Sequence, residues 1–252
     1  STDIINEDVS FYSGMNFNGY TNSVEADINI PDTCTIELWG YSNSVYDSYS
    51  RMLWSIESEN YDSGPDLYFS GNTISLNIGD GTNNAFSGIA NYPASDTWNH
   101  YAVTFDKANN ISKLYINGAY AGSATYRNPK GKKLFIGTYN YDNLYHWAGK
   151  VKEVRVWNEV RTQTEIQQNM AKTITKTDDN LVGYYPLFYD PSDVVYDMSG
   201  NDNDAVANSL NRISGLSFDG IDDYVQTSGS FPSTVTVEAW AYANAMEGKM
   251  LW

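Results

Sequence analysis

The chain has 252 residues and a formal net charge of −16, with 31 acidic and 15 basic side chains. This balance argues against nucleic-acid binding, because the phosphates would be repelled, and it equally disfavours anionic membrane surfaces. The single cysteine, Cys34, cannot form an intrachain disulfide. Its counterpart in the internal repeat described below is Val235, so we expect a small apolar core site. No apolar run is long enough to span a bilayer, and we therefore expect no membrane insertion.

Short segments of alternating apolar residues recur along the chain, as half-buried β-strands require. They cover residues 33–41, 51–56, 66–69, 73–78, 99–105, 112–116, 133–136 and 152–157. Gly, Asn, Asp and Pro stand between them. Asn117-Gly118 predicts a tight hairpin, because both central residues of its turn favour positive φ. The pattern predicts an all-β protein, a two-sheet antiparallel β-sandwich.

One segment, residues 161–171, has helical features. Thr162 and Thr164 are candidate N-caps, Glu165 stands near the first turn, and Ile166 and Met170 are four residues apart. Residues 172–180 are poor in apolar side chains and mark a connector. We expect a further strand over 181–187 and a loop over 190–208.

The opening of the chain returns near its end. Phe17, Gly19, Pro31, Glu37, Trp39 and Tyr41 recur 201 positions later as Phe218, Gly220, Pro232, Glu238, Trp240 and Tyr242. A shared offset over so many positions indicates an internal repeat. We predict a complete domain over residues 1–175, then a connector and the N-terminal part of a second, incomplete copy over 176–252. Residues 181–252 have three interpretations: part of a longer repeat array, strands supplied to the first domain, or strands supplied to a neighbouring molecule.

Taken in order, these motifs resemble the laminin-G-like, concanavalin A-like jelly rolls and their pentraxin relatives. The resemblance is carried by residues 218–225, by 98–106 with 114–118, and by 147–157. It implies a jelly roll whose members mostly bind carbohydrates or proteins, often with calcium at the rim of the sandwich. Many occur in long secreted or surface-anchored bacterial proteins, so we expect a secreted or cell-surface location.

Calcium is the expected cofactor, because it needs several oxygen ligands in one place. The resemblance to pentraxins places such ligands in two loops, at Asp62 and Asp66 and at Asn140, Asp142 and Asn143. The second copy adds an acidic cluster at Asp219, Asp222 and Asp223, near the loop from Asp197 to Asp204. The alternative is a set of solvated turns in which Asn and Asp serve the backbone conformation.

Aromatic side chains on loops could stack on a sugar ring, because stacking needs an exposed face. The candidates are Tyr61, Tyr92, Tyr139, Tyr141 and Tyr145. We assign Trp39 to the core, since Trp240 recurs in the same alternating pattern.

Catalytic groups are not evident in the sequence. No pair of strand carboxylates is spaced to flank a glycosidic bond. Glu37 has Thr35 and Tyr41 as same-face neighbours, which suggests a solvent-facing position, and we interpret His100 as a hydrogen-bonded strand histidine. We therefore expect a protein that is not an enzyme.

The leading hypothesis is a non-catalytic binding or adhesion module of a secreted or cell-surface repeat protein, calcium-dependent and part of a larger assembly or filament. One alternative is a carbohydrate-binding module of a polysaccharide-degrading enzyme, and another is a structural filament subunit assembled by strand exchange. The expected partners are a glycan or protein ligand at the loop rim and a further copy or neighbouring repeat.

Overall fold

The computed structural model describes residues 4–5, 14–42, 51–58, 63–70, 73–77, 86–91, 95–126, 128–139, 145–172, 174, 180–187, 193–208 and 225–226. The chain forms two compact units. One unit comprises Gly14–Ser214, and the other comprises Ser1–Ser13 together with Gly215–Trp252.

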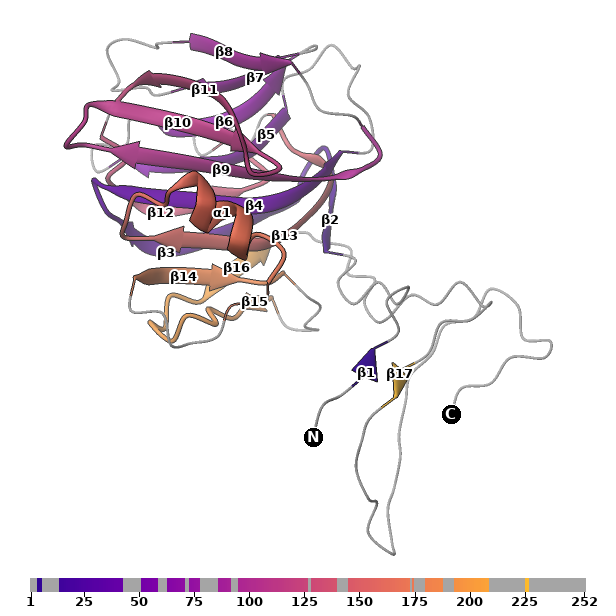
Figure 1. Cartoon of the computed structure of the whole chain (residues 1–252). Helices are drawn as coiled ribbons and strands as arrows, with labels where there is room; N and C mark the ends of the chain where they lie inside the picture. Colours follow the sequence, from indigo (N-terminus) through magenta and orange to yellow (C-terminus); the bar gives the residue numbers. More distant parts are fainter. Residues whose placement is uncertain are drawn as a thin grey trace, which may run out of the picture. The chain divides into compact units, whose positions relative to one another are not determined.

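The Gly14–Ser214 unit is a sandwich of two antiparallel sheets (Figure 1). The seven-stranded sheet has the order β11 (Ala119–Thr125), β10 (Ile111–Ile116), β9 (Trp98–Asp106), β4 (Cys34–Ser42), β13 (Ala148–Trp157) and β14 (Leu181–Tyr185), with β2 (Met15–Asn18) also paired to β13. The eight-stranded sheet has the order β15 (Val194–Val195), β16 (Ala205–Asn208), β3 (Ser23–Ile30), β12 (Gly131–Ile136), β5 (Arg51–Ser58), β6 (Ser63–Ser70), β7 (Thr73–Asn77) and β8 (Phe86–Asn91). The predicted fold class is confirmed, and each predicted strand overlaps an observed one.

The core lies between the two sheets, because each strand turns alternate side chains inward. On β3, Val24, Ala26, Ile28 and Ile30 are buried and belong to the main hydrophobic cluster. Cys34 is fully buried in the same cluster, as the sequence predicts.

The Asn117-Gly118 hairpin forms as predicted, with φ angles of 50° and 72°. The helix is shorter than predicted: α1 spans Gln163–Asn169 and begins with a capping box between Thr162 and Glu165. It lies against the outer face of the seven-stranded sheet (Figure 1). There Ile166 of α1 packs with Ala102 of β9 and Tyr115 of β10.

Residues 181–187 and 193–208 belong to the first sandwich, although the sequence predicts that this domain ends at residue 175. β14 confirms the strand expected at 181–187, and it pairs with β13. The loop expected over 190–208 is partly wrong, because it contains β15 and β16, and β16 pairs with β3. The alternation of Ala205 and Ala207 with exposed neighbours is short and uses small side chains, so it gives only a weak strand signal.

In the second unit, the described residues are β1 (Ile4–Ile5) and β17 (Val225–Gln226), which form an antiparallel pair. The repeated motifs at 218–223 and 234–242 lie outside the described residues. Across the described parts of both units, no helix is long and apolar enough to cross a membrane.

Candidate functional site

The outer face of the eight-stranded sheet carries a row of paired residues. Phe135 of β12 lies opposite Ser55 of β5, Ser55 lies opposite Asp66 of β6, and Asp66 lies opposite Asn77 of β7. Their strand neighbours Leu134, Ile56, Leu67 and Leu76 belong to the core, so this row must face outward. All four members of the row are nevertheless buried.

Asp66 is the predicted calcium ligand that the structure describes. Its side chain is 1% exposed, and its Oδ2 accepts a hydrogen bond of 3.2 Å from Asn77 Nδ2. The other oxygen, Oδ1, is buried without a hydrogen-bond partner, and so is Oδ1 of Asn77. Burial raises the pKa of Asp66 to about 8, and the hydrogen bond from Asn77 opposes this only in part.

The predicted Tyr139 and Tyr145 lie close to the same row. Ser55, the partner of Asp66, donates a hydrogen bond of 3.1 Å from its Oγ to the carbonyl of Thr138. Tyr139 follows Thr138, and its ring packs edge-on against Tyr145 with centroids 6.4 Å apart. The carbonyl of Tyr145 accepts a hydrogen bond from the backbone of Met52 on β5. The structure therefore places a predicted metal ligand on β6 and two predicted sugar-stacking residues beside the neighbouring strand β5.

The remaining predicted ligands lie outside the described residues. For the metal these are Asp62, Asn140, Asp142, Asn143, Asp219, Asp222 and Asp223, and for the sugar they are Tyr61, Tyr92 and Tyr141. Where the chain is described, no three His, Cys, Asp or Glu side chains form a metal-binding group.

Asp197 and Asp204, which border the loop assigned to the acidic cluster, bind backbone groups instead. The Asp197 carboxylate accepts hydrogen bonds from the backbone N–H groups of Tyr184, Ser199 and Asn203. Asp204 accepts one from the N–H of Asp197 itself. These carboxylates shape the turn between β15 and β16.

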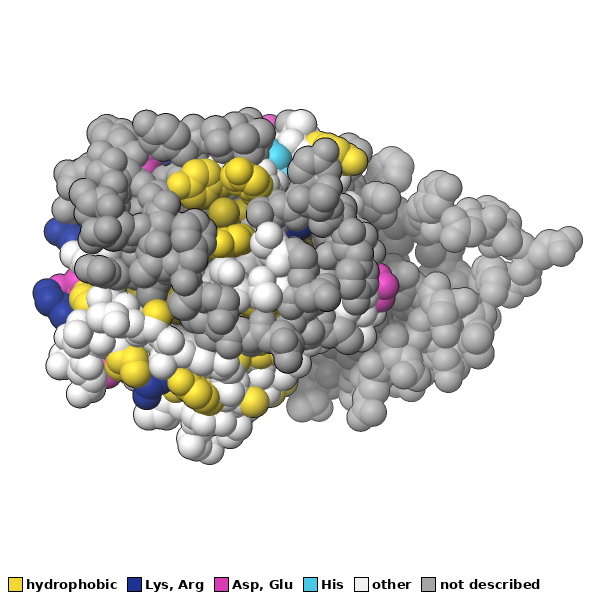
Figure 2. All heavy atoms as spheres, turned by 90° about the horizontal axis from the view of Figure 1, so that it is seen from above, with side chains coloured by type: hydrophobic (Ala, Val, Ile, Leu, Met, Phe, Trp, Pro, Cys, Tyr) yellow, Lys and Arg dark blue, Asp and Glu magenta, His cyan; other side chains and the backbone are white. Residues whose placement is uncertain are grey.

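Exposed aromatic side chains are few in the described part of the chain. Tyr20, Tyr120, Tyr196 and Tyr145 are 76%, 54%, 50% and 43% exposed, and Tyr145 is the member of this set that was predicted as a sugar contact. When the molecule is viewed from above relative to Figure 1, the described hydrophobic side chains form several separate groups on this face (Figure 2).

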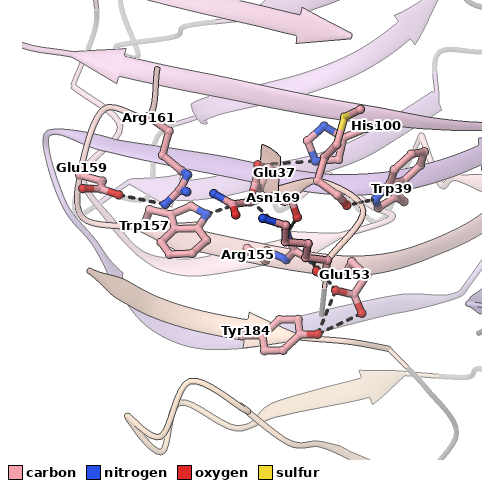
Figure 3. A network of polar contacts seen from close by, with 12 residues as sticks. Glu37, Trp39, His100, Glu153, Arg155, Trp157, Glu159, Arg161, Asn169 and Tyr184 are labelled. Atoms are coloured by element: carbon pink, nitrogen blue, oxygen red, sulfur yellow. Dashed lines mark hydrogen bonds and ion pairs between the residues drawn. The ribbon is translucent and has the colours of Figure 1, made fainter. Parts of the chain in front are cut away.

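A second polar cluster lies on the outer face of the seven-stranded sheet (Figure 3). Glu37 Oε1 accepts a hydrogen bond of 3.0 Å from Trp157 Nε1 and one of 3.5 Å from Arg155 Nη1. Arg155 also pairs with Glu153 at 2.6 Å, and Tyr184 of β14 donates to Glu153. All of these side chains are buried, and charged residues at such depth require partners of this kind.

The solvent-facing position expected for Glu37 is wrong, because its side chain is fully buried. The strand alternation does turn it away from the core, but the segment that contains α1 covers that face. Burial raises the pKa of Glu37, and the nearby Arg155 guanidinium opposes the shift. His100, whose Nε2 lies 3.5 Å from Glu37 Oε2, has its pKa lowered to about 3 by burial and by Arg155, so it is neutral near pH 7.

This cluster fastens the α1 segment to the sheet. Arg155 donates to the carbonyls of Asn169 and Lys172, and Trp39 Nε1 donates to the carbonyl of Met170 at 2.7 Å (Figure 3). Trp39, which we assigned to the core, is therefore a half-buried outer-face residue that holds the end of the helix. Because its donors bind backbone carbonyls at the end of α1, the cluster has a structural role: it holds the α1 segment on the sheet.

Sequence reasoning missed Ser55 and Asn77, the neighbours of Asp66. Both occupy the outward positions of alternating strands, where a polar residue is ordinary, so only the register between strands reveals that they meet Asp66. Arg155 and Glu153 were missed for the same reason.

Comparison with known proteins supports this fold. Residues 15–167 match the laminin G family of the concanavalin A-like lectin/glucanases superfamily, whereas a search of curated proteins found no match. Among solved structures, the chain is similar to a candidate carbohydrate-binding protein from Bacteroides ovatus, with 16% identity and a TM-score of 0.60 over 81% of this chain and 61% of that one. It thus spans less than two thirds of that protein.

Two further similar structures cover nearly the whole of the compared protein. The heptameric SAP-like pentraxin from Limulus polyphemus has 13% identity and a TM-score of 0.52, over 77% of this chain and 93% of that one. The CBM40 of the Ruminococcus gnavus IT-sialidase, bound to α2,3-sialyllactose, has 16% identity and a TM-score of 0.50, over 62% and 96%. At these identities the similarity concerns the fold, and the profile match establishes the family. The chain therefore belongs to the concanavalin A-like lectin/glucanases superfamily, in its laminin G branch.

Proposed function

We propose that this protein is a non-catalytic, calcium-dependent carbohydrate-binding module that takes its ligand at the outer face of the eight-stranded sheet, beside Asp66. The observation that carries the proposal is the pair of buried oxygens, Asp66 Oδ1 and Asn77 Oδ1, that have no hydrogen-bond partner. A buried acceptor without a donor is costly, and two such acceptors on facing strands suit a hard cation.

The chemistry of these donors fits Ca²⁺ in particular. Calcium binds carboxylate and amide carbonyl oxygens, and Asp66 and Asn77 offer one of each. Asp66 must lose its proton to bind the ion, because the protonated carboxyl is a poor metal ligand. The ion would hold Asp66 ionised in a site where burial alone favours its neutral form.

A carbohydrate ligand is supported by the neighbouring aromatic pair and by the similar proteins. Tyr145 is 43% exposed and Tyr139 packs against it, so one ring remains accessible to a sugar face. The names of two similar proteins, the Bacteroides ovatus protein and the Ruminococcus gnavus CBM40, refer to carbohydrate binding. A sugar that is stacked on Tyr145 could reach the calcium with its hydroxyl oxygens.

Calcium binding is tested by isothermal titration of CaCl₂ into three proteins at pH 7.5. Wild type and Asp27→Asn should bind equally, since Asp27 is exposed on the same sheet face and faces Lys133 instead. Asp66→Asn should bind at least tenfold more weakly, because the carboxylate is lost. Equal calcium binding by all three proteins would show that the calcium site lies elsewhere. No calcium binding by wild type would reject calcium dependence.

Carbohydrate binding is tested on a glycan array, with calcium and then with EDTA. Tyr145→Asn removes the ring and keeps a residue that tolerates the positive φ of 62° found there. It should lose binding, whereas Tyr120→Ala on the far edge of the other sheet should not. A calcium-dependent signal lost only in Tyr145→Asn supports the proposal. A protein that binds no glycan but retains calcium would instead favour adhesion to a protein ligand.

The setting that we propose is a secreted or cell-surface repeat protein in which this module serves adhesion. Its support is the repeat within the sequence together with the laminin G membership. The alternatives are separated by ligand and by activity. Binding to a plant or algal polymer would favour a carbohydrate-binding module of a polysaccharide-degrading enzyme, and release of sugar from a bound polymer would contradict the absence of catalysis.

A further inference from the structure

Residues 181–208 are called the closing segment here, and their described parts, 181–187 and 193–208, cover one edge of each sheet of the first sandwich. β14 pairs with β13 along Val154–Trp157, and β16 pairs with β3 along Ser23–Ala26. Without this segment, both edges would present unpaired backbone groups, which are a template for another strand. The closing segment is therefore the piece that completes both sheets at this end of the sandwich (Figure 1).

The closing segment also supplies part of the hydrophobic core. Tyr185 is fully buried, and Leu187, Val195, Ala205 and Ala207 are 2%, 6%, 1% and 2% exposed, all within the main cluster. An unclosed sandwich would expose the apolar surface against which they pack, so a strong driving force favours docking of such a segment.

Its shape is fixed largely by its own contacts. The Asp197 carboxylate holds the backbone of Tyr184, Ser199 and Asn203, and the hydroxyl of Tyr185 donates to the carbonyl of Asn203. All of these partners lie inside the closing segment. It can therefore dock as one preorganised piece, which reduces the entropy cost of binding.

The chain contains a second strand of the same kind. Under the repeat offset of 201, Asp204, Ala205 and Val206 correspond to Asp3, Ile4 and Ile5, an acidic residue followed by two apolar ones. Under the same offset, Val225 and Gln226 of β17 correspond to Val24 and Glu25 of β3. β1 and β16 are thus two versions of a lead-in strand that precedes each copy.

Neither lead-in strand pairs with the copy that follows it. β16 precedes the second copy but lies on β3 of the first, with Val206 opposite Glu25 and Ala207 opposite Val24. β1 precedes the first copy but lies on β17 of the second, with Ile4 opposite Gln226 and Ile5 opposite Val225. Under the repeat offset, the pairing of β1 with β17 matches the pairing of β16 with β3, except that the register is shifted by one residue. Each lead-in strand thus pairs with the other copy and not with the copy that it precedes.

We propose that the edges of β3 and β13 accept the closing segment of a second copy of this chain in place of their own, so that two chains join by exchange of residues 181–208. The acceptor recognises backbone hydrogen bonds and small apolar side chains, and these are identical whether the segment belongs to the same chain or to another. This proposal is independent of calcium and of carbohydrate binding.

A mixed-chain disulfide experiment tests the exchange on the full 252-residue protein. One chain carries Glu25→Cys and the other Val206→Cys, two positions that lie directly opposite each other between β3 and β16. Antiparallel partners have the Cα separation that a disulfide requires. Cys34 is buried, and burial raises the pKa of its thiol well above the usual range, so it should not react.

The two chains are unfolded in urea, mixed, refolded by dilution and oxidised, and the products are separated on a non-reducing gel. We expect at least fivefold more disulfide-linked dimer from this pair than from Val206→Cys mixed with Tyr120→Cys, whose residue is exposed on the distant strand β11. Equal yields from the two mixtures would overturn the proposal.

The double variant Glu25→Cys/Val206→Cys keeps the result interpretable. At low concentration it should form an internal disulfide, which shows that β16 docks on β3 in the stated register. At higher concentration it should also yield linked dimers. An internal disulfide at every concentration, together with no mixed dimer, would mean that the segment closes only its own chain. Failure to form either product would refute the docking itself.

Discussion

The proton on Asp66 gives its side chain a measurable effect on stability. Burial raises its pKa to about 8 in the folded protein, against about 3.9 for an unperturbed aspartate. Between these values the folded state keeps a proton that the unfolded state has released. The free energy of unfolding of the calcium-free protein should therefore fall as pH rises from about 4 to about 8, by at most about 1.4 kcal/mol per pH unit.

Asp66→Asn should remove this pH dependence. The amide cannot ionise, and its Nδ2 can donate to the partnerless Oδ1 of Asn77. In EDTA, the variant should gain stability over wild type progressively between pH 5 and pH 8, as measured by urea unfolding. At the same concentration, added calcium should stabilise wild type more than the variant. A stability difference that is constant with pH would show that Asp66 is ionised without a cation.

Glu37 should be needed for stability rather than for binding. Glu37→Ala would leave the Arg155 guanidinium without one of its two acidic partners and the Trp157 indole N–H without an acceptor. Removing one member of a buried ion pair typically costs about 3–5 kcal/mol. Glu37→Gln should cost less, because its amide oxygen can still accept from Trp157. Urea unfolding compares both variants with Asp27→Ala on the exposed side of β3. Equal losses of stability in all three would show that the contacts of Glu37 with Arg155 and Trp157 do not stabilise the fold.

Asp66 and Glu37 show what a single sequence can and cannot place. Strand alternation assigns Glu37 correctly to an outward position, whereas Asp66 was expected in a loop and lies within β6. Whether an outward position meets solvent depends on which segment folds over that face, and that is a long-range property. The α1 segment covers Glu37, so the prediction for Glu37 is wrong, although the strand that carries it is right. The predicted role of Asp66 as a calcium ligand came from a resemblance to pentraxins and stays a prediction.

At the scale of single elements, the capping box of α1 offers a controlled test. Thr162 Oγ1 accepts from the backbone of Glu165, and the Glu165 carboxylate accepts from the backbone of Thr162. Thr162→Ala should cost about 1 kcal/mol of stability in urea unfolding. Thr164→Ala, the other candidate cap, lies inside the helix and is exposed, so it should change stability little. Equal effects would mean that the cap does not contribute.

Elements with strong local signals could be predicted from the sequence, and the closing elements could not. The Asn117-Gly118 hairpin and the Thr162 cap follow from local chemistry, and both are confirmed. β15 and β16 are short and flank a turn rich in Gly, Asn and Asp, so their residues look like loop. Their strand conformation comes from pairing with each other and with β3, whose Val24 and Ala26 are about 180 positions away in the sequence.

At the scale of the whole molecule, the sequence repeat and the compact units share a boundary. The repeat restarts at Gly215, and the first compact unit ends at Ser214. The lead-in strand before Gly215 nevertheless closes the first sandwich. The lead-in strand of the second copy, β16, is therefore part of the first sandwich, and a repeat found in the sequence does not by itself show which strands complete each domain.

The connector between α1 and β14 should decide whether the closing segment docks in its own chain. Leu181 lies opposite Trp157 on β13, so the chain must return from the end of α1 to the end of β13, where Asn158 N donates to the carbonyl of Asn180. Deleting residues 175–178 should strain this return without affecting docking onto another chain, because a shortened hinge favours exchange. Light scattering during size-exclusion chromatography should then show a dimer fraction several-fold above wild type, with calcium and with EDTA alike.

Insertion of a Gly-Ser pair at the same place should shift the balance back to monomer. A shortened chain that stays a folded monomer would show that the connector does not limit docking, and an unfolded monomer would show that the sandwich cannot use a closing segment from a second copy.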